Sequence, residues 1–399
     1  MRKMKFGLFG KIVVAILCGV ALGFAFAHFG AAGDACVRAM KTFNVLFAQI
    51  LKFIVPLLIL GLVTPAIADT GKSAGRMLLL TMGLATVSTV FSGYYSFFAS
   101  TSVLPHLIAG GAASGAVAAG KDFPTYFHIG IPPLADIVTS LVFSFVVGLG
   151  IVATKAERVS AFFGEFRGIV AVGIEKAVVP FLPGYVLSVV ADITACGKLA
   201  AIAGQSVRLM GFCVCATVVL LLVQYAVAGL VAGRNPLKAL LTMLPAYLTG
   251  WGCCSSAATI PVTLRQTLKN GVSRETADLV IPLCSSVHLS GSMCNMVAYA
   301  AGVMYMFGET PDLAHFTPYI FMLSVVAIAS PGVPGGVVLA SAGIVESALG
   351  FSPERYALMV AIYMALDGMG TACNLTGDGA IALVVDRFSG RDGNRKGNG

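Results

Sequence analysis

Long apolar segments separated by short polar ones dominate the chain. A helix needs about 20 apolar residues to cross a bilayer, and several segments approach or exceed that length. Pro180 and Pro183 interrupt one of them, which breaks its helical pattern. The apolar pattern predicts an all-α polytopic membrane protein with eight transmembrane helices. The segments are 12–29, 43–67, 78–100, 137–153, 177–195, 212–231, 277–307 and 356–385.

Two shorter apolar segments in the back half are interrupted by small residues. Residues 239–248 are too short to span and run into the serine-rich stretch 249–261. Residues 318–328 run into the proline- and glycine-rich stretch 329–336 and return through 337–349. Each pattern predicts a re-entrant helical hairpin. The two hairpins would enter from opposite sides, as in the inverted repeats of secondary transporters.

A polar stripe lies inside the last apolar segment. Asp367, Thr371, Asn374 and Asp378 are spaced by four, three and four residues, which places them within roughly 60° on one helix face. A carboxylate in the middle of a span costs about 2.5–3.5 kcal/mol and persists where it meets a partner, a cation or a substrate. The stripe therefore predicts one wall of a small-molecule or ion site, although a structural network between helices would give the same pattern.

Composition and charge support a membrane protein. Hydrophobic residues make up 57% of the chain and charged residues 11%, and the mean hydropathy is +0.90. The net charge of +8 does not indicate nucleic-acid binding. The connections between predicted spans are alternately rich and poor in Lys and Arg, as in a membrane protein. Basic connections remain in the cytoplasm, so both termini are expected there. A basic start could also belong to a signal peptide, but residues 12–29 lack a clear cleavage site and fit a first span better.

The cysteines and histidines form no recognisable cofactor site. Most of the ten cysteines lie in apolar segments, and no CxxC pair exists. The five histidines are scattered. We therefore expect no cofactor. His288 has no acidic neighbour evident in the sequence, so it is expected to be a satisfied core histidine.

Three motifs resemble the dicarboxylate/amino acid:cation symporters, also called the glutamate-transporter or sodium:dicarboxylate symporter family. Residues 255–262 (SSAATIPV) resemble the first hairpin tip of that family, and residues 332–336 (GVPGG) resemble the second tip. Asp367 and residues 374–378 (NLTGD) resemble its final helix. The match covers about residues 238–387, and the front half agrees in its number of spans.

The resemblance implies a glutamate-transporter-like fold and a homotrimer in the cell inner membrane. It assigns residues 1–237 mainly to scaffold and trimerisation, with some elements joining the transport unit. Residues 238–387 would form the transport core, and residues 388–399 a disordered basic cytoplasmic tail.

The resemblance also implies site residues. The ammonium of the substrate would meet Asp367 and its carboxylate Asn374, with Thr371 nearby and the two hairpin tips closing over it. The substrate site would comprise Ser256, Ser292, Val333, Asp367, Gly370, Thr371 and Asn374. A first sodium site would use Cys284, His288, Asn374 and Asp378, with His288 contributing a backbone carbonyl. A second would use Ser286, Ala327, Ile328 and Ser330.

Departures from the family pattern bear on the substrate. Residues 288–292 (HLSGS) lack the aspartate of the family motif, which removes the carboxylate of a third sodium site. Gly370 stands where an arginine can pair with an acidic substrate, and Cys254 also replaces a possible arginine. Gly370 would leave an open, uncharged space. A second substrate carboxylate would be buried unpaired, so a neutral amino acid is expected.

The expected function is import of a neutral amino acid coupled to sodium. A proton-coupled or a dicarboxylate transporter of the same fold is the alternative. A passive channel would not need two re-entrant tips. An intramembrane hydrolase using Ser290 and His288 is remote, because side chains at i and i+2 point about 160° apart on a helix. We therefore do not expect an enzyme.

Overall fold

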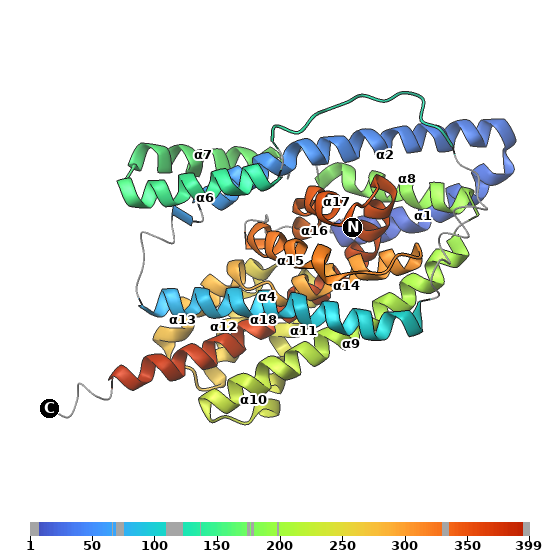
Figure 1. Cartoon of the computed structure of the whole chain (residues 1–399). Coiled ribbons are helices and arrows are strands. Elements are labelled where there is room, and N and C mark those ends of the chain that lie inside the picture. Colours follow the sequence, from blue (N-terminus) through green and yellow to red (C-terminus); the bar gives the residue numbers. More distant parts are fainter. Residues whose placement is uncertain are drawn as a thin grey trace, which may run out of the picture.

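The computed structural model describes residues 8–65, 67–68, 76–108, 123–135, 137–173, 176, 179–197, 199–328 and 335–393. Within these ranges the chain is almost entirely helical and has no β-strand, as the apolar pattern predicts. Figure 1 shows the helices as a bundle of long and short rods.

Most helices of the front half coincide with predicted apolar segments. Pro180 lies in a short 3-10 turn and Pro183 in the first turn of the following helix, where proline costs no intrahelical hydrogen bond. The helices are α1 (Leu8–His28), α2 (Gly30–Leu58), η1 (Ile59–Val63), α4 (Arg76–Leu107), α6 (Ile137–Thr154), α7 (Glu157–Gly173), η3 (Val179–Phe181), α8 (Leu182–Ala195) and α9 (Leu199–Ala232).

The back half consists of shorter helices and one long one. The first interrupted segment forms α11 and α12, which pack against each other and join at Cys254 in the left-handed conformation (φ 50°). The helices are α10 (Pro236–Thr242), α11 (Leu244–Cys253), α12 (Ser256–Lys269), α13 (Arg274–Val287), α14 (Ser290–Met306), α15 (Leu313–Ile328), α16 (Gly336–Ala340), α17 (Ala342–Leu349) and α18 (Pro353–Gly393). Residues 388–393 are thus helical, against the expectation of a disordered tail from residue 388.

Among the described residues, three helical stretches are long and apolar enough to cross a bilayer: Met77–Leu107, Ile202–Ala232 and Arg274–Met306. A fourth is obtained if Arg355–Met364 and Leu366–Ser389, bent by 63°, form one span. Four shorter apolar helices, including Val14–His28 and Val142–Thr154, coincide with other predicted segments. The count of eight spans and the re-entrance of the hairpins remain predictions.

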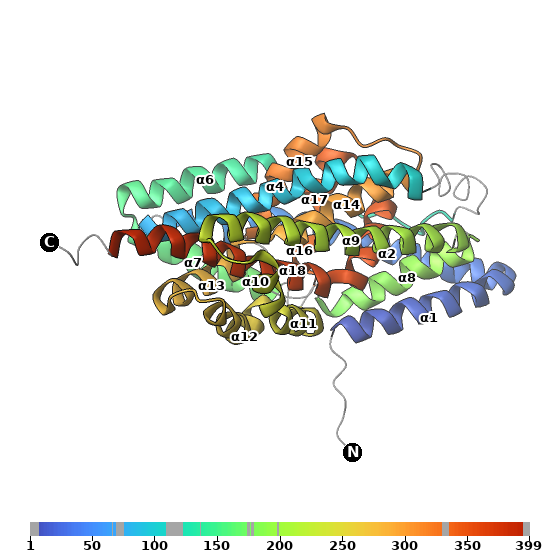
Figure 2. The same cartoon turned by 90° about the horizontal axis from the view of Figure 1, so that it is seen from below.

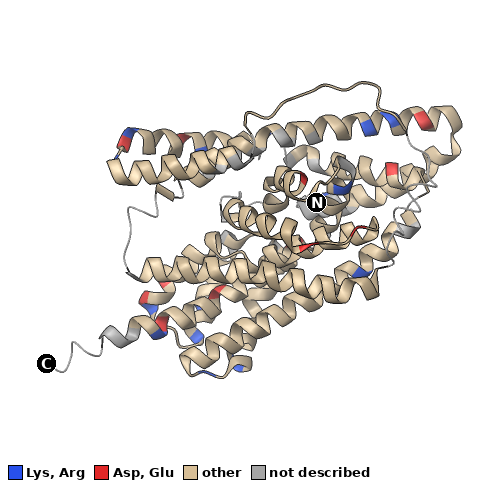
Figure 3. Ribbon diagram, viewed as in Figure 1, with Lys and Arg blue, Asp and Glu red and all other residues tan. Residues whose placement is uncertain are grey.

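Charged residues are sparse along the middle of the bundle. Figure 3 shows Lys, Arg, Asp and Glu mainly toward the helix ends. Large apolar side chains such as Val146, Phe162 and Ile169 are instead exposed on α6 and α7. An exposed apolar face of this kind fits contact with lipid.

The helices associate in two groups that do not follow chain order. In one group α1 and α2 pack against α8, and Figure 2 shows α1 and α8 side by side. In the other, α4 and α9 from the front half pack against α14 and α18 from the back half. Two long helices from outside the 238–387 segment therefore flank α14 and α18.

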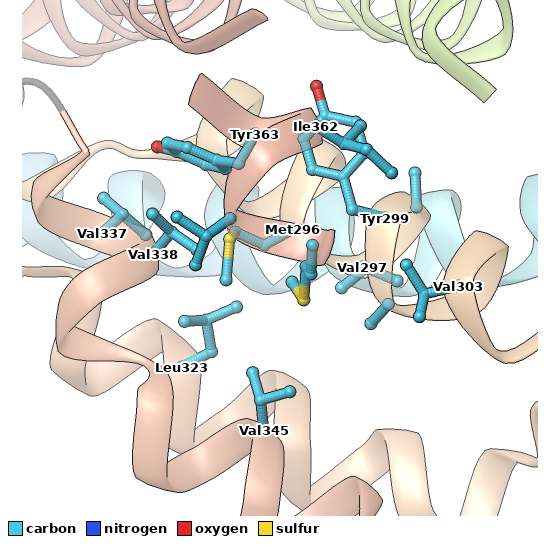
Figure 4. Close-up of a cluster of buried hydrophobic side chains, with 14 of the residues drawn as sticks. Met296, Val297, Tyr299, Val303, Leu323, Val337, Val338, Val345, Ile362 and Tyr363 are labelled. Carbon is cyan, nitrogen blue, oxygen red and sulfur yellow. The ribbon is translucent and has the colours of Figure 1, made fainter. Parts of the chain in front are cut away.

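A buried apolar cluster holds the second interrupted segment in place. Figure 4 shows Met296 and Val297 of α14 beside Leu323 of α15, Val338 of α16 and Val345 of α17. All five side chains are buried. Their burial fixes α16 and α17 against α14, which packs on the helix that carries the polar stripe, α18.

Candidate functional site

The four residues of the polar stripe are buried in α18. Asp367 and Thr371 are each 8% exposed, and Asn374 and Asp378 are less exposed still. The Thr371 hydroxyl donates to the Asp367 carbonyl of its own helix. Buried polar groups in a helix need partners, and residues distant in the sequence supply partners for the other three.

Asn374 contacts the first turn of α14. Its Oδ1 accepts hydrogen bonds from the N–H groups of Gly291 at 2.7 Å and Ser292 at 3.1 Å. Its Nδ2 donates to Ser292 Oγ at 3.0 Å. The first N–H groups of a helix have no intrahelical partner, and the residue preceding α14, Leu289, provides no side-chain cap. Asn374 therefore acts as a cap supplied from another helix.

Asp367 contacts the second interrupted segment. Its Oδ2 accepts a hydrogen bond from the Gly335 N–H at 2.8 Å, and Tyr363 also hydrogen-bonds to this carboxylate. Gly335 has φ +77°, a conformation that favours glycine, and it precedes α16. The carboxylate expected to receive the substrate ammonium thus touches the end of the predicted second hairpin tip.

Asp378 contacts the side chain of His288. Nδ1 of His288 lies 2.9 Å from Asp378 Oδ1, and Nε2 lies 2.9 Å from Ser88 Oγ on α4. Gln224 of α9 donates to the same Ser88 hydroxyl at 3.1 Å. Asp378 Oδ2 has no hydrogen-bond partner among the described residues. His288 therefore does have an acidic neighbour, on a helix distant in sequence, and its side chain is part of the site in addition to its carbonyl.

The remaining predicted cation ligands are only partly described. The Cys284 carbonyl accepts the His288 N–H at 2.8 Å. Ser286 is exposed on α13, Ala327 is buried on α15 and Ile328 ends that helix. Ser330 and Val333 lie outside the described residues. No group of three or more His, Cys, Asp and Glu side chains is placed to hold a metal ion in the described part of the chain.

Gly370 lies where α14 and α18 approach closely. A Cβ atom on Gly370 would lie 3.3 Å from Asn295 Nδ2 and 3.4 Å from Ser292 Oγ. A Cβ atom on Gly291 would lie 2.4 Å from the Cys373 Cβ. The expectation of open space at Gly370 is therefore wrong, because polar atoms of α14 meet it.

The first interrupted segment also approaches α18. A Cβ atom on Gly368 would lie 2.3 Å from the Trp251 carbonyl oxygen and 3.0 Å from Cys254 Sγ. Ser256, a predicted substrate contact, is the first residue of α12 and is half-buried. Both interrupted segments thus reach the helix that carries the stripe.

The sequence did not single out several groups at this site. In the sequence Tyr363, Gln224 and Asn295 each look like one polar residue in an apolar run, and Ser88 looks like one of several small polar residues in such a run. A polar side chain inside a predicted span is the signal that could have found them.

Comparison with known proteins identifies the family. The model of the sodium:dicarboxylate symporter family matches residues 8–388. The proton/sodium-glutamate symport protein of Bacillus subtilis is 24% identical over 418 residues, covering 98% of this chain and 94% of that protein. The serine/threonine transporter SstT of Acinetobacter baumannii strain AYE is 25% identical over 419 residues, covering 96% and 97%.

A shorter match agrees with these two. Excitatory amino acid transporter 4 of Mus musculus is 28% identical over 164 residues, covering 41% of this chain and 29% of that protein. The chain is therefore an integral membrane protein and a secondary transporter, and it is not an enzyme. It belongs to the sodium:dicarboxylate symporter family.

Proposed function

We propose that this protein imports a neutral amino acid by symport with sodium. One observation carries the choice of a neutral substrate. Neither α14 nor residues 356–386 of α18 contain a lysine or arginine, so these two helices offer no cation to a second substrate carboxylate. Burying such a carboxylate unpaired costs several kcal/mol. Two relatives are named as a glutamate and a serine/threonine transporter, and the second class fits this site better.

The proposed binding mode uses groups that already have partners in the structure. The substrate ammonium would bind Asp367, whose Oδ2 is held by the Gly335 N–H. The substrate carboxylate would bind Asn374 at the first turn of α14, because the positive end of a helix dipole favours an anion. Thr371 would lie beside the substrate. Backbone near Ser256 and Val333 would close over it from the two hairpins.

Sodium would bind at oxygen atoms beside the substrate. Asp378 would supply the charged ligand, with carbonyls near Cys284, His288 and Asn374. The Asp378 Oδ2 atom has no hydrogen-bond partner among the described residues, so it is available to a cation. The second site would use Ser286, Ala327, Ile328 and Ser330. Oxygen cages suit a hard cation, and we propose no other cofactor.

The assembly and orientation are also proposals. Basic connections favour cytoplasmic termini in a cell inner membrane, and the family favours a homotrimer. Helices of the front half such as α2 and α8 would form the subunit interface. Because α4 and α9 pack on α14 and α18, we propose that these two helices move with the transport core.

Uptake into proteoliposomes tests the function. Purified protein is reconstituted, and uptake of labelled serine is followed with an inward sodium gradient, with choline, or with an inward proton gradient. Concentrative uptake that needs sodium supports the proposal. Uptake driven by the proton gradient without sodium would favour the proton-coupled alternative, for which the His288–Asp378 contact provides a structural basis. Flux without any gradient dependence would indicate a channel.

A further inference from the structure

Asn295 is a buried polar residue of α14 that no step above uses. Its side chain is 1% exposed, and its Oδ1 has no hydrogen-bond partner among the described residues. A buried amide oxygen without a partner is costly and calls for an explanation. The surrounding residues locate it relative to the substrate site.

Three contacts between α14 and α18 define its position. Ser292 contacts Asn374. Asn295 Nδ2 lies 3.3 Å from the position that a Cβ atom on Gly370 would take. Tyr299 packs edge-on against Tyr363, with 6.0 Å between the ring centroids. Figure 4 shows these two tyrosines near each other. Residue numbers rise along α14 as they fall along α18, so the helices run antiparallel.

This order places Asn295 opposite the middle of the polar stripe. Gly370 lies three residues after Asp367 and four before Asn374. The proposed binding mode puts the ammonium at Asp367 and the carboxylate at Asn374, so the α-carbon and side chain of the substrate lie between them. Gly370 has no side chain, and the nearest atom to its Cβ position outside α18 is Asn295 Nδ2.

We infer that Asn295 determines specificity by binding the side chain of the transported amino acid, and that it selects a short side chain with a hydroxyl group. This inference rests on the proposed function. An amide provides a donor and an acceptor, and a hydroxyl can satisfy both. An apolar side chain of equal size would leave the Asn295 oxygen unpaired, and a site built to hydrogen-bond a hydroxyl rejects the analogue that lacks one.

The close approach of the two helices limits the size of that side chain. A Cβ atom on Gly291 would collide with Cys373 and with the Gly370 carbonyl, at 2.4 and 2.6 Å. Helices this close exclude a large group beside Asn295. The preferred substrates are therefore serine and threonine. Alanine and valine, their apolar analogues, are expected to bind less tightly.

The experiment compares threonine with valine, which have nearly the same shape. Dissociation constants for both are measured by thermal shift on the purified full-length protein in saturating sodium. We expect the wild type to prefer threonine by at least roughly tenfold. Asn295→Leu keeps the volume of the side chain and removes both polar groups, so the preference should fall to near one. Tyr299→Phe, which removes another buried polar group of α14, should leave the preference unchanged.

Several outcomes would overturn the inference. Equal binding of threonine and valine by the wild type would contradict the role of Asn295, but not the proposed transport of neutral amino acids. An undiminished threonine preference in a well-folded Asn295→Leu protein would also contradict that role. If that variant does not fold, Asn295→Ala is measured by the same criterion. Tighter binding of aspartate than of any neutral amino acid would instead contradict the proposed function itself.

Discussion

Nδ1 of His288 lies 2.9 Å from Asp378 Oδ1, and both side chains are fully buried. The contact joins the break between α13 and α14 to the end of the polar stripe on α18. One oxygen of the carboxylate is thus held by an imidazole, and the other has no hydrogen-bond partner among the described residues. His288 is therefore a direct partner of a carboxylate proposed to bind sodium.

The first prediction follows from that contact. His288→Leu should increase the stabilisation that sodium gives to the protein, because the sodium-free variant leaves a buried carboxylate without a partner, at a cost of about 1–3 kcal/mol. Thermal unfolding with sodium or choline measures the difference. His288→Asn is the control, since its Nδ2 can replace Nδ1 as a donor to Asp378. A sodium effect in His288→Leu no larger than in the wild type would contradict the prediction.

The second prediction concerns Asp378 itself. Asp378→Asn should raise the sodium concentration needed for half-maximal uptake or abolish uptake, because an amide lacks the charge that binds a cation. Coupling is reciprocal, so substrate should also tighten sodium binding in the wild type. Asp386→Asn, on the same helix but bonded to Ser273, is the matched control. Unchanged sodium dependence in Asp378→Asn would place the cation site elsewhere.

The third prediction isolates the charge of Asp367. Asp367→Asn keeps an oxygen that can accept from the Gly335 N–H, so the contact with the second interrupted segment should survive. The substrate ammonium would lose its counter-charge, which typically costs about 3–5 kcal/mol, well over a hundredfold in affinity. Amino-acid binding measured by thermal shift should disappear, with expression and oligomer size unchanged. Near-normal uptake by the variant would exclude Asp367 as the ammonium site.

Apolar patterning predicted most of the helices, and charge explains the exceptions. The helix α7 was not expected because Arg158, Glu165 and Arg167 interrupt its apolar run. Likewise α2 begins well before residue 43, where the predicted apolar segment begins. Asp34 and Arg38 lie within its first turns and interrupt the apolar pattern there. Amphipathic helices of this kind lack the continuous apolar run that marks a span.

Site contacts were less accessible to sequence reasoning, because they join distant residues. The stripe on α18 was visible because helical periodicity is local. The partners of Asn374 and Asp378, Ser292 and His288, are 82 and 90 residues away. Which atoms meet depends on how closely α14 and α18 cross, and that distance follows from packing of the whole bundle.

A fourth prediction tests that crossing. Gly291→Ala should destabilise the protein by about 1–3 kcal/mol, because its Cβ would lie 2.4 Å from the Cys373 Cβ and 2.6 Å from the Gly370 carbonyl oxygen. Gly370→Ala should have a smaller effect, since its nearest contact is 3.3 Å. Gly211→Ala on α9, with no atom within 4 Å of its Cβ position, is the control. Equal unfolding temperatures for all three variants would argue against the close approach.

The last prediction concerns the charge of the substrate. Gly370→Arg should abolish binding of neutral amino acids, because the new side chain must enter the contact between Gly370, Ser292 and Asn295 and its charge would be buried. A guanidinium can bind a carboxylate through two parallel hydrogen bonds, so the variant should gain affinity for aspartate relative to serine.

Competition in the wild type decides between the two substrate classes without relying on a variant. Unlabelled aspartate, glutamate, serine, threonine and alanine are each tested against uptake of labelled serine in sodium. The neutral amino acids should compete at concentrations at least roughly a hundredfold lower than the acidic ones, since a second carboxylate buried without a cation costs several kcal/mol. Displacement by aspartate or glutamate in preference to every neutral amino acid would show that a cation reaches the substrate side chain from residues outside α14 and α18, and the neutral-substrate proposal would then be wrong.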